Sequence, residues 1–150
     1  MTAKTLQGGT AGPMRPQGNE LGNAMLKLGF KQMLAQANAV IETLSVQDLP
    51  YLQDDPNVVI VDVRDSAERE SAGMIPNSIH APRGMLEFHA DPECPAHLPA
   101  LDPGKRLVLY CGTGGRSALA AKTLQDMGFE DVLSLAGGYA AWRAANGPAD

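Results

Sequence analysis

The sequence predicts an α/β domain with a mostly parallel sheet, and three observations support this prediction. Two apolar runs, at 58–62 (four apolar residues followed by Asp62) and at 107–110, are typical of strands that are covered on both faces. Strand-like and helix-like segments alternate along the chain, which favours βαβ units with right-handed crossovers. The chain has 150 residues, of which 44% are hydrophobic, and this is enough for one domain with a buried core.

Charge and hydropathy exclude several classes of protein. The formal net charge of −5, from 12 basic and 17 acidic side chains, argues against a sequence-independent nucleic-acid binder, because phosphate contacts need an excess of basic residues. No stretch approaches the roughly 18 apolar residues of a membrane span, and the first 20 residues lack the apolar run of a secretory signal. Two cysteines cannot form the disulfide framework of a secreted scaffold of this size. We therefore expect a soluble protein of the reducing cytoplasm that binds neither a membrane nor nucleic acid.

The chain is expected to begin with two segments outside the domain. Residues 1–20 contain four glycines and two prolines without a periodic apolar pattern, which predicts a flexible tail or an artefact of a tag or start site. Residues 21–43 are predicted to form an amphipathic helical extension of four or five turns, because apolar residues recur there at three- and four-residue spacing. This helix either packs on the domain or serves a partner, and a homodimer through residues 21–43 is one such arrangement. The residues of the apolar stripe are Leu26, Phe30, Met33, Leu34, Ala37, Val40, Ile41 and Leu44.

The predicted domain spans residues 44–146, with residues 147–150 as a C-terminal tail. In its first half, Ser45 is expected to cap a short helix with Asp48 at the third position. The β-branched run at 58–62 follows a turn and predicts a central strand. The remaining segments of this half, each set off by turn residues, are a short polar helix at 66–71, a short strand at 78–81, a helical turn at 83–88 and a loop with four prolines at 91–106.

The second half alternates strands and helices more clearly. After the second apolar run, the spacing of apolar residues predicts a helix at 118–127, which Gly128 ends as a left-handed cap. The segment 132–135 predicts another strand. A last helix is expected at 139–145, with Trp142 packed back on the core.

A cysteine and a glycine-rich loop follow the second apolar run and predict an active site there. Ligands of parallel α/β sheets bind outside the carboxyl ends of the strands, and Cys111 lies at such an end. Gly112, Gly114 and Gly115 let the backbone curl and turn several N–H groups inward, and the helix that follows adds its positive N-terminal end. Arg116 adds a positive charge. A sulfur at the focus of these donors is stabilised as a thiolate, which is the reactive form of cysteine.

Three other interpretations of this segment fit less well. A buried structural cysteine does not explain three glycines and an arginine in the next five residues. A dinucleotide-binding fingerprint fails because Ser117 stands where the third glycine is required. A protein-phosphatase loop has five residues between its cysteine and its arginine, whereas four separate Cys111 from Arg116. This smaller ring suits a single sulfur atom better than a tetrahedral phosphate.

Five motifs in order along the chain resemble those of a single-domain rhodanese. They are Asp62-Val63-Arg64, Gly73-Met74-Ile75-Pro76-Asn77-Ser78, Pro82-Arg83-Gly84, Cys111-Gly112-Thr113-Gly114-Gly115-Arg116-Ser117-Ala118, and Leu135-Ala136-Gly137-Gly138 with Trp142. The resemblance covers residues 44–146 and implies a rhodanese fold, which is a five-stranded, mostly parallel sheet with helices on both faces. It also implies a sulfurtransferase that carries sulfur as a persulfide on Cys111.

The resemblance also assigns the residues of the site. The loop that binds the substrate and the persulfide is Gly112, Thr113, Gly114, Gly115 and Arg116. Asp62 is expected to brace the site by hydrogen bonding, Arg64 to pair with a carboxylate or attract an anionic donor, and Ser117 to support the loop. For Asp62 and Arg64 a structural salt bridge is the other interpretation. Glu68 is a candidate to orient Arg116 or Arg64, and neither a cofactor nor a metal is expected.

The expected reaction moves sulfane sulfur from a small anionic donor such as thiosulfate to cyanide, a thiol or a protein acceptor. Two departures from the family leave the donor open: Met74 stands where the family often has histidine, and Arg116 is the only charged residue of the loop. One alternative is a sulfur-carrier or redox-sensing module that delivers sulfur to a protein partner with little turnover of thiosulfate. Others are a phosphatase or arsenate-reductase-like enzyme on the same fold and a non-catalytic interaction domain, against which the intact cysteine and glycine cradle argue.

The second cysteine lies in the proline-rich loop. Cys94 with His89 and His97 does not match a strong zinc-binding pattern. A resolving thiol for Cys111 and an inert surface thiol are the other interpretations of Cys94. His80, at a strand end before a proline, is expected to be a hydrogen-bonded structural residue rather than a general base.

Overall fold

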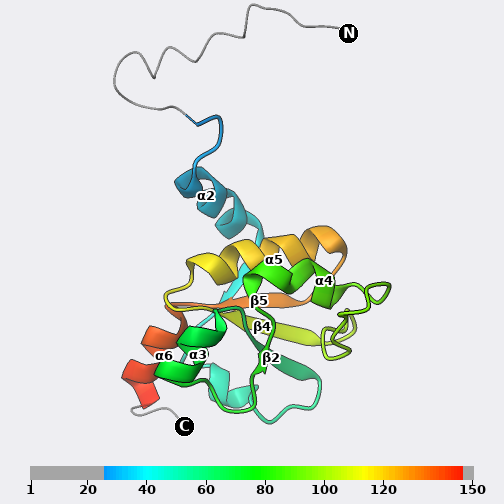
Figure 1. The fold of residues 1–150 in the computed structure, drawn as a ribbon. Helices are drawn as coiled ribbons and strands as arrows, with labels where there is room; N and C mark the ends of the chain where they lie inside the picture. The colour runs from blue at the N-terminus through cyan, green and yellow to red at the C-terminus, as the bar shows by residue number, and fades with distance from the viewer. Residues whose placement is uncertain (1–25, 147–150) are drawn as a thin grey trace, which may run out of the picture. The chain divides into compact units, whose positions relative to one another are not determined.

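The computed structural model describes residues 26–146 of the chain. Met1–Phe30 and Lys31–Asp150 form separate units, and the fold described here is that of the second unit. Its centre is a five-stranded sheet in the order β1-β5-β4-β2-β3, in which every pairing is parallel (Figure 1). The strands are β1 (Glu42–Leu44), β2 (Val58–Asp62), β3 (Ile79–His80), β4 (Arg106–Tyr110) and β5 (Val132–Leu135). The predicted α/β class with a parallel sheet is therefore confirmed.

Helical segments connect these strands. They are α2 (Phe30–Val40), the 3-10 turn η1 (Leu49–Tyr51), α3 (Ser66–Ala72), the 3-10 turn η2 (Arg83–Met85), α4 (Leu86–Ala90), α5 (Gly115–Met127) and α6 (Gly138–Asn146). The loop between α4 and β4 contains the four prolines that the sequence places there.

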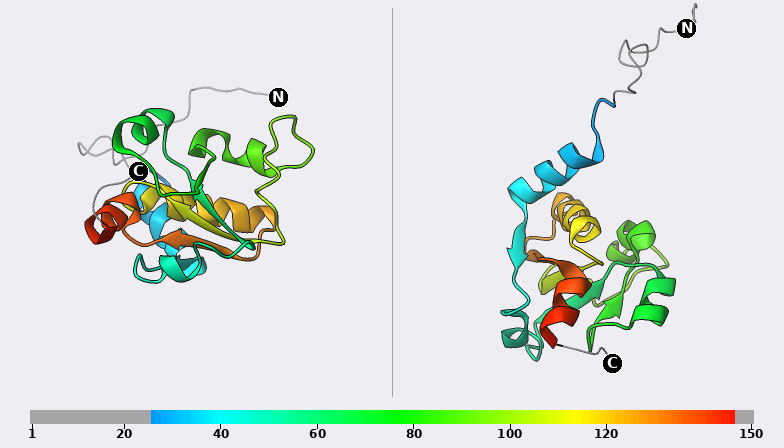
Figure 2. Two further views of the ribbon diagram at one scale, coloured as in Figure 1. Left: turned by 90° about the horizontal axis from the view of Figure 1, so that it is seen from below. Right: turned by 90° about the vertical axis from the view of Figure 1, so that its left-hand side faces the viewer.

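Two apolar layers cover the sheet, because successive residues of a strand point to opposite faces. On one face, Leu107 and Leu109 of β4 pack with residues of α2, α4 and α5. On the other face, Val108 and Tyr110 pack with η1 and α6. Figure 1 shows α4 and α5 on one side of the sheet and α6 on the other, and Figure 2 shows the same layers from two further sides.

The predicted helical extension at 21–43 is wrong in its boundaries. Residues 26–29 are not helical, α2 ends at Val40, and Glu42–Leu44 form the edge strand β1. Leu44 pairs with Leu135 of β5, so the sheet begins before the predicted domain boundary at residue 44. Ile41 and Leu44 continue the helical spacing of apolar residues, although neither lies in the helix. Ile41 packs in the core, and Leu44 lies in strand β1. The predictions for residues 1–20, 21–25 and 147–150 lie outside the described residues.

Two helix starts also differ from the prediction. Helix α5 begins at Gly115, three residues before the predicted start at 118, because Gly114 takes a φ of +113° and the chain becomes helical immediately after it. This places the amide of Ser117 in the first turn of the helix. Ser45 caps no helix. Its hydroxyl accepts a hydrogen bond from the amide of Gln47, and the turn η1 begins only at Leu49.

No helix within residues 26–146 is both long enough and apolar enough to cross a lipid bilayer.

Candidate active site

Cys111 directly follows β4, which lies between β5 and β2 in the sheet. Its side chain is 1% exposed and belongs to the apolar layer that contains α5. The loop after it reaches α5 within four residues, so the amides of the loop and the first turn of the helix converge on the sulfur. This is the position that the sequence predicts for a nucleophile.

Hydrogen bonds to the sulfur come from the loop and from the helix. The amide of Gly114 donates to Sγ of Cys111 at 3.1 Å and the amide of Ser117 donates at 3.4 Å, while the Ser117 hydroxyl lies 3.6 Å from Sγ. Burial raises the pKa of the Cys111 thiol, but these bonds and one from the amide of Thr113 outweigh burial and lower the pKa below its ordinary value. The site therefore favours a thiolate.

A second serine hydroxyl lies next to that of Ser117. Ser134 of β5 lies with its Oγ 2.8 Å from Oγ of Ser117, and both side chains are almost fully buried. The Ser117 hydroxyl is also within 3.2 Å of the carbonyl oxygen of Gly114. When Ser134 donates to Ser117, the Ser117 hydroxyl proton has two remaining acceptors, the Gly114 carbonyl oxygen and the sulfur. Ser134 was not predicted as a site residue, and the signal for it was a polar side chain inside an otherwise apolar strand.

Helix α6 holds the other side of the loop. The amide of Tyr139 donates to the carbonyl of Cys111 at 2.8 Å, and the amide of Ala140 donates to the carbonyl of Gly112 at 3.0 Å. The bond to the Gly112 carbonyl fixes the peptide that carries the Thr113 amide, which is one of the donors to the sulfur. Gly138 has a φ of +61°, and a Cβ there would lie 2.6 Å from the Cys111 carbonyl oxygen. The close approach of α6 to the loop thus depends on this glycine.

Arg116 points to α3. Its two terminal nitrogens donate to the two carboxylate oxygens of Glu68 at 2.7 and 2.8 Å. The bonds from Arg116 lower the pKa of Glu68 to about 2, and the same pair raises the pKa of Arg116. The guanidinium lies beside the loop, since a Cβ on Gly112 would lie 3.2 Å from Nη2 of Arg116. Glu68 therefore orients Arg116, as one of the sequence interpretations expected.

Thr113, Gly114 and Gly115 also line an open pocket of about 320 Å³ on the outer side of the loop. The other lining residues are Leu34, Asn38, Thr43, Ser134, Leu135, Ala136 and Gly137. Ser134 is thus both a lining residue of this pocket and the hydrogen-bond partner of Ser117.

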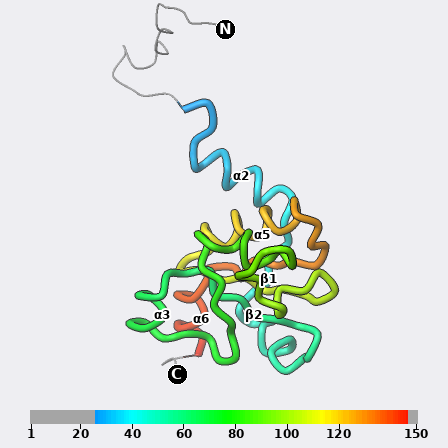
Figure 3. Tube along the Cα trace, turned by 45° about the vertical axis from the view of Figure 1, so that its right-hand side comes forward, coloured from blue at the N-terminus to red at the C-terminus, as the bar shows by residue number. Residues whose placement is uncertain are grey.

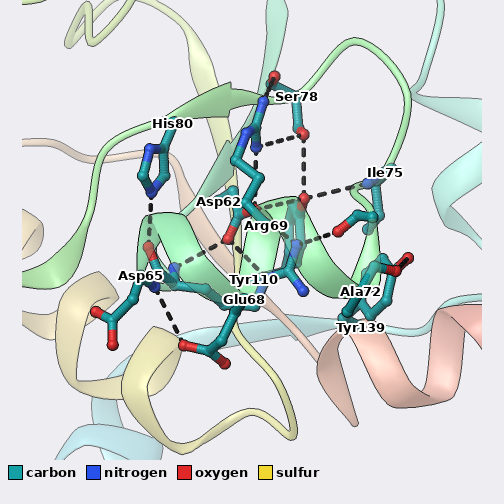
Figure 4. Close-up of polar contacts among 12 residues, drawn as sticks. Asp62, Asp65, Glu68, Arg69, Ala72, Ile75, Ser78, His80, Tyr110 and Tyr139 are labelled. Atoms are coloured by element: carbon teal, nitrogen blue, oxygen red, sulfur yellow. Dashed lines mark hydrogen bonds and ion pairs between the residues drawn. The ribbon is translucent and has the colours of Figure 1, made fainter. Parts of the chain in front are cut away.

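Asp62 makes the structural salt bridge that was one of its two predicted roles, and no described hydrogen bond joins it to the sulfur loop (residues 111–116). Asp62 lies in β2 beside Tyr110 of β4 and accepts hydrogen bonds from Arg64, Arg69 and Tyr110 (Figure 4). Like Tyr110, Asp62 points to the face of the sheet opposite Cys111, because the two strands run in register and side chains alternate. Burial raises the pKa of Asp62, but its bonds with Arg64 and Arg69 outweigh burial and lower it.

Arg64 is part of the same buried cluster. It is 2% exposed, pairs with Asp62 at 2.8 Å and donates to the carbonyl of Gly73 at 2.7 Å. Its guanidinium lies 4.3 Å from the ring centre of Tyr139 and 5.3 Å from that of Tyr110. All of these contacts are structural, so Arg64 pairs with a carboxylate in a structural salt bridge, as two of its predicted interpretations expected.

Helices α3 and α6 lie side by side next to this cluster (Figures 1 and 3). The hydroxyl of Tyr139 donates to the carbonyl of Ala72 at the end of α3, at 2.6 Å. Tyr139 therefore ties together the sulfur loop, through its amide, and α3, which carries Glu68.

The histidines and the second cysteine make local contacts. His80 bonds through Nε2 to the carbonyl of Arg64 at 2.7 Å, which confirms its predicted structural role. Sγ of Cys94 accepts a hydrogen bond from the amide of Ala96, and Nδ1 of His89 is hydrogen-bonded to the carbonyl oxygen of Ala96. Within residues 26–146 no three histidine, cysteine or acidic side chains are grouped so as to hold a metal ion. A resolving role for Cys94 stays a prediction.

Comparison with known proteins agrees with this architecture. The sequence profile of the rhodanese-like domain matches residues 45–145. A solved structure from Rhodopseudomonas palustris, titled as a protein of unknown function and possible tyrosine phosphatase, is 48% identical, covers 84% of this chain and 97% of its own, and superposes with a TM-score of 0.79.

Two curated relatives carry sulfurtransferase names. The thiosulfate sulfurtransferase GlpE of Shewanella oneidensis is 36% identical over 69% of this chain and 93% of its own length. The adenylyltransferase and sulfurtransferase uba4 of Ogataea parapolymorpha is 31% identical over 77% of this chain, but the chain spans only 26% of that protein. With its five-stranded parallel sheet and its cysteine loop, the chain belongs to the rhodanese-like domain family.

Proposed function

We propose that this chain is a sulfurtransferase that carries sulfane sulfur as a persulfide on Cys111. The observation that carries the proposal is the set of bonds to the sulfur: two amides donate to Sγ, and a serine hydroxyl lies beside it. A thiolate held in this way is a ready nucleophile. The outer sulfur of the persulfide extends one S–S bond beyond Sγ, and we propose that N–H groups of the loop stabilise its charge. The names of relatives such as GlpE support sulfur transfer in general.

The proposed reaction has two steps. The Cys111 thiolate attacks the outer sulfur of thiosulfate, an S–S bond forms to the enzyme, and the S–S bond of thiosulfate breaks with its electron pair leaving on sulfite. A thiol, cyanide or a protein acceptor then attacks the outer sulfur, and the Cys111 thiolate leaves. The steps need no histidine base when the thiolate is already formed, and no cofactor enters the scheme.

A phosphatase is the second candidate, because the structure from Rhodopseudomonas palustris is titled as a possible tyrosine phosphatase. A phosphatase needs its loop arginine to grip a phosphate with both arms. Here both arms of Arg116 bind Glu68, and four residues rather than five separate Arg116 from Cys111. These two features favour sulfur transfer.

The identity of the acceptor and the assembly are also proposals. A sulfur-carrier role, in which Cys111 delivers sulfur to a protein partner with little thiosulfate turnover, uses the same persulfide. A homodimer through residues 21–43 stays a prediction.

Intact mass spectrometry tests the proposal. Wild type and Cys94→Ser are each expected to gain one sulfur atom after incubation with thiosulfate or a polysulfide, and cyanide should remove it. Cys111→Ser should gain none. If wild type gains no sulfur from either donor, or hydrolyses p-nitrophenyl phosphate through Cys111 instead, the sulfurtransferase proposal is overturned.

A further inference from the structure

Glu68 lies beside the sulfur loop, where it is paired with the loop arginine, Arg116. It belongs to α3, and its carboxylate binds both terminal nitrogens of Arg116, the only charged residue among the loop positions 111–116. The side chains of Arg116 and Glu68 are 42% and 36% exposed, so the pair lies at the surface rather than in the core. A donor that approaches Cys111 past Arg116 therefore meets an arginine whose charge is already matched by a carboxylate.

Three neighbouring arginines are also paired with carboxylates. Arg64 and Arg69 bind Asp62, and Arg83 binds Glu87 and Thr123. A further carboxylate, that of Asp65 at the start of α3, is close enough to raise the pKa of Arg116. Within residues 64–83 every arginine thus has a carboxylate partner. Arg64 and Arg69 share the single carboxylate of Asp62, but their side chains are only 2% and 18% exposed, so the positive charge that remains there is largely shielded from a donor in solvent.

The effect of pairing Arg116 with Glu68 depends on the charge of the sulfur donor. Attack of a thiolate on thiosulfate brings together one and two negative charges, whereas attack on a thiosulfonate anion brings together one and one. In both reactions the outer sulfur moves to Cys111 and the electron pair of the broken bond leaves on sulfite or sulfinate. The sulfur chemistry is the same, and the donors differ by one charge at the group that faces solvent.

We propose that Glu68 sets the charge selectivity of the donor site: by holding both arms of Arg116, it disfavours dianionic donors such as thiosulfate relative to donors with a single negative charge. This inference rests on the proposed persulfide chemistry of Cys111. Glu68 acts as a positioning and selectivity residue, since it binds Arg116 and not the reacting sulfur.

The test compares sulfur loading from two donors, thiosulfate and methanethiosulfonate, at pH 7. The second-order rate constant for persulfide formation is measured by intact mass for wild type, Glu68→Gln and Glu70→Gln. In wild type the amide of Asp65 donates a hydrogen bond to the Glu68 side chain at 3.1 Å. Glutamine at residue 68 keeps an oxygen that can accept this bond, so the start of α3 is preserved. Glu70 is an exposed carboxylate on the same helix, and its replacement is the matched control for a change in net charge.

Glu68→Gln is expected to raise the ratio of thiosulfate to methanethiosulfonate loading about fivefold, the effect of one unit charge across a few ångströms of water. Glu70→Gln should change this ratio less than twofold, and the double variant Glu68→Gln with Arg116→Gln should lose the gain. An equal change with both donors, or an unchanged ratio in a Glu68→Gln protein that melts like wild type, overturns the inference. Absence of loading of wild type by either donor overturns the proposed function itself.

Discussion

The hydroxyl of Ser134 lies 2.8 Å from the hydroxyl of Ser117, which joins the strand β5 to the sulfur site at the start of α5. Ser117 is the group that approaches the sulfur through both its amide and its hydroxyl. The proton of the Ser117 hydroxyl has two other acceptors within reach, the Gly114 carbonyl and Ser134. Donation by Ser134 removes one of these alternatives, so only the Gly114 carbonyl still competes with the thiolate for the Ser117 proton.

The lowered pKa of Cys111 predicts fast alkylation below the pH at which an ordinary thiol reacts. In a Cys94→Ser background, Cys111 is the single thiol, and its reaction with iodoacetamide is followed from pH 5 to 9. The folded protein is expected to reach half of its maximal rate at a lower pH than the same protein in urea, where the loop donors are lost. Coincidence of the two profiles would contradict the hydrogen-bonding argument.

Removal of the Ser134 hydroxyl is expected to slow this reaction. Ser134→Ala should lower the rate of alkylation at pH 7 by roughly three- to tenfold, because one neutral hydrogen bond supports the thiolate through Ser117. Ser117→Ala should have a larger effect, since it removes the direct contact. Ser134→Thr keeps the hydroxyl and should restore the wild-type profile. An unchanged pH profile in Ser134→Ala would reduce Ser134 to a packing role.

The sequence predicted the sulfur loop well, because the chemistry of Cys111 to Arg116 is local. Strand β2 and strand β5 were predicted at their observed boundaries, since both are short apolar runs between turns. The edge strand β1 was missed, because its three residues continue a helical spacing and only pairing with β5 distinguishes them. For Asp62 the sequence left two roles open, a brace of the site and a structural salt bridge. The structure shows the salt bridge, and the sequence could not decide between the two because the face of the sheet to which Asp62 points depends on register.

Loss of the Asp62 charge should destabilise the fold while leaving the sulfur site intact. Asp62→Asn leaves Arg64 buried without its ionic partner, and this is expected to cost about 3 kcal/mol of unfolding free energy. Urea denaturation measures the loss. The alkylation profile of Cys111 should not move, because Asp62 makes no described contact with the loop. Asp54→Asn, an exposed change of the same kind, is the control and should be neutral.

The same carboxylate makes stability depend on pH. The folded pKa of Asp62 is lowered, so its contribution is fully present above its unfolded pKa of about 3.9 and is lost as the pH falls through the folded value. The free energy of unfolding of wild type should therefore fall with acidification below about pH 4. Asp62→Asn should show a shallower decline over this range. Parallel curves for the two proteins would assign the acid sensitivity to other groups.

Gly138→Ala tests the hold of α6 on the sulfur loop. The added Cβ would lie 2.6 Å from the carbonyl oxygen of Cys111 and 2.8 Å from the carbonyl carbon and oxygen of Gly112, and all of these are backbone atoms that cannot turn aside. The left-handed φ of +61° adds strain for any side chain. The loop must therefore shift, and the bond from the Tyr139 amide to Cys111 is lost or lengthened.

Sulfur loading of Cys111 in Gly138→Ala is expected to fall tenfold or more, because displaced donors no longer point at the sulfur. The melting temperature should fall as well, so loading is measured at a temperature where circular dichroism shows the variant to be folded. Gly84→Ala is the matched control, because a Cβ at Gly84 meets no atom within 4 Å and should leave both measurements unchanged. Wild-type loading by a folded Gly138→Ala protein would show that α6 does not set the geometry of the loop.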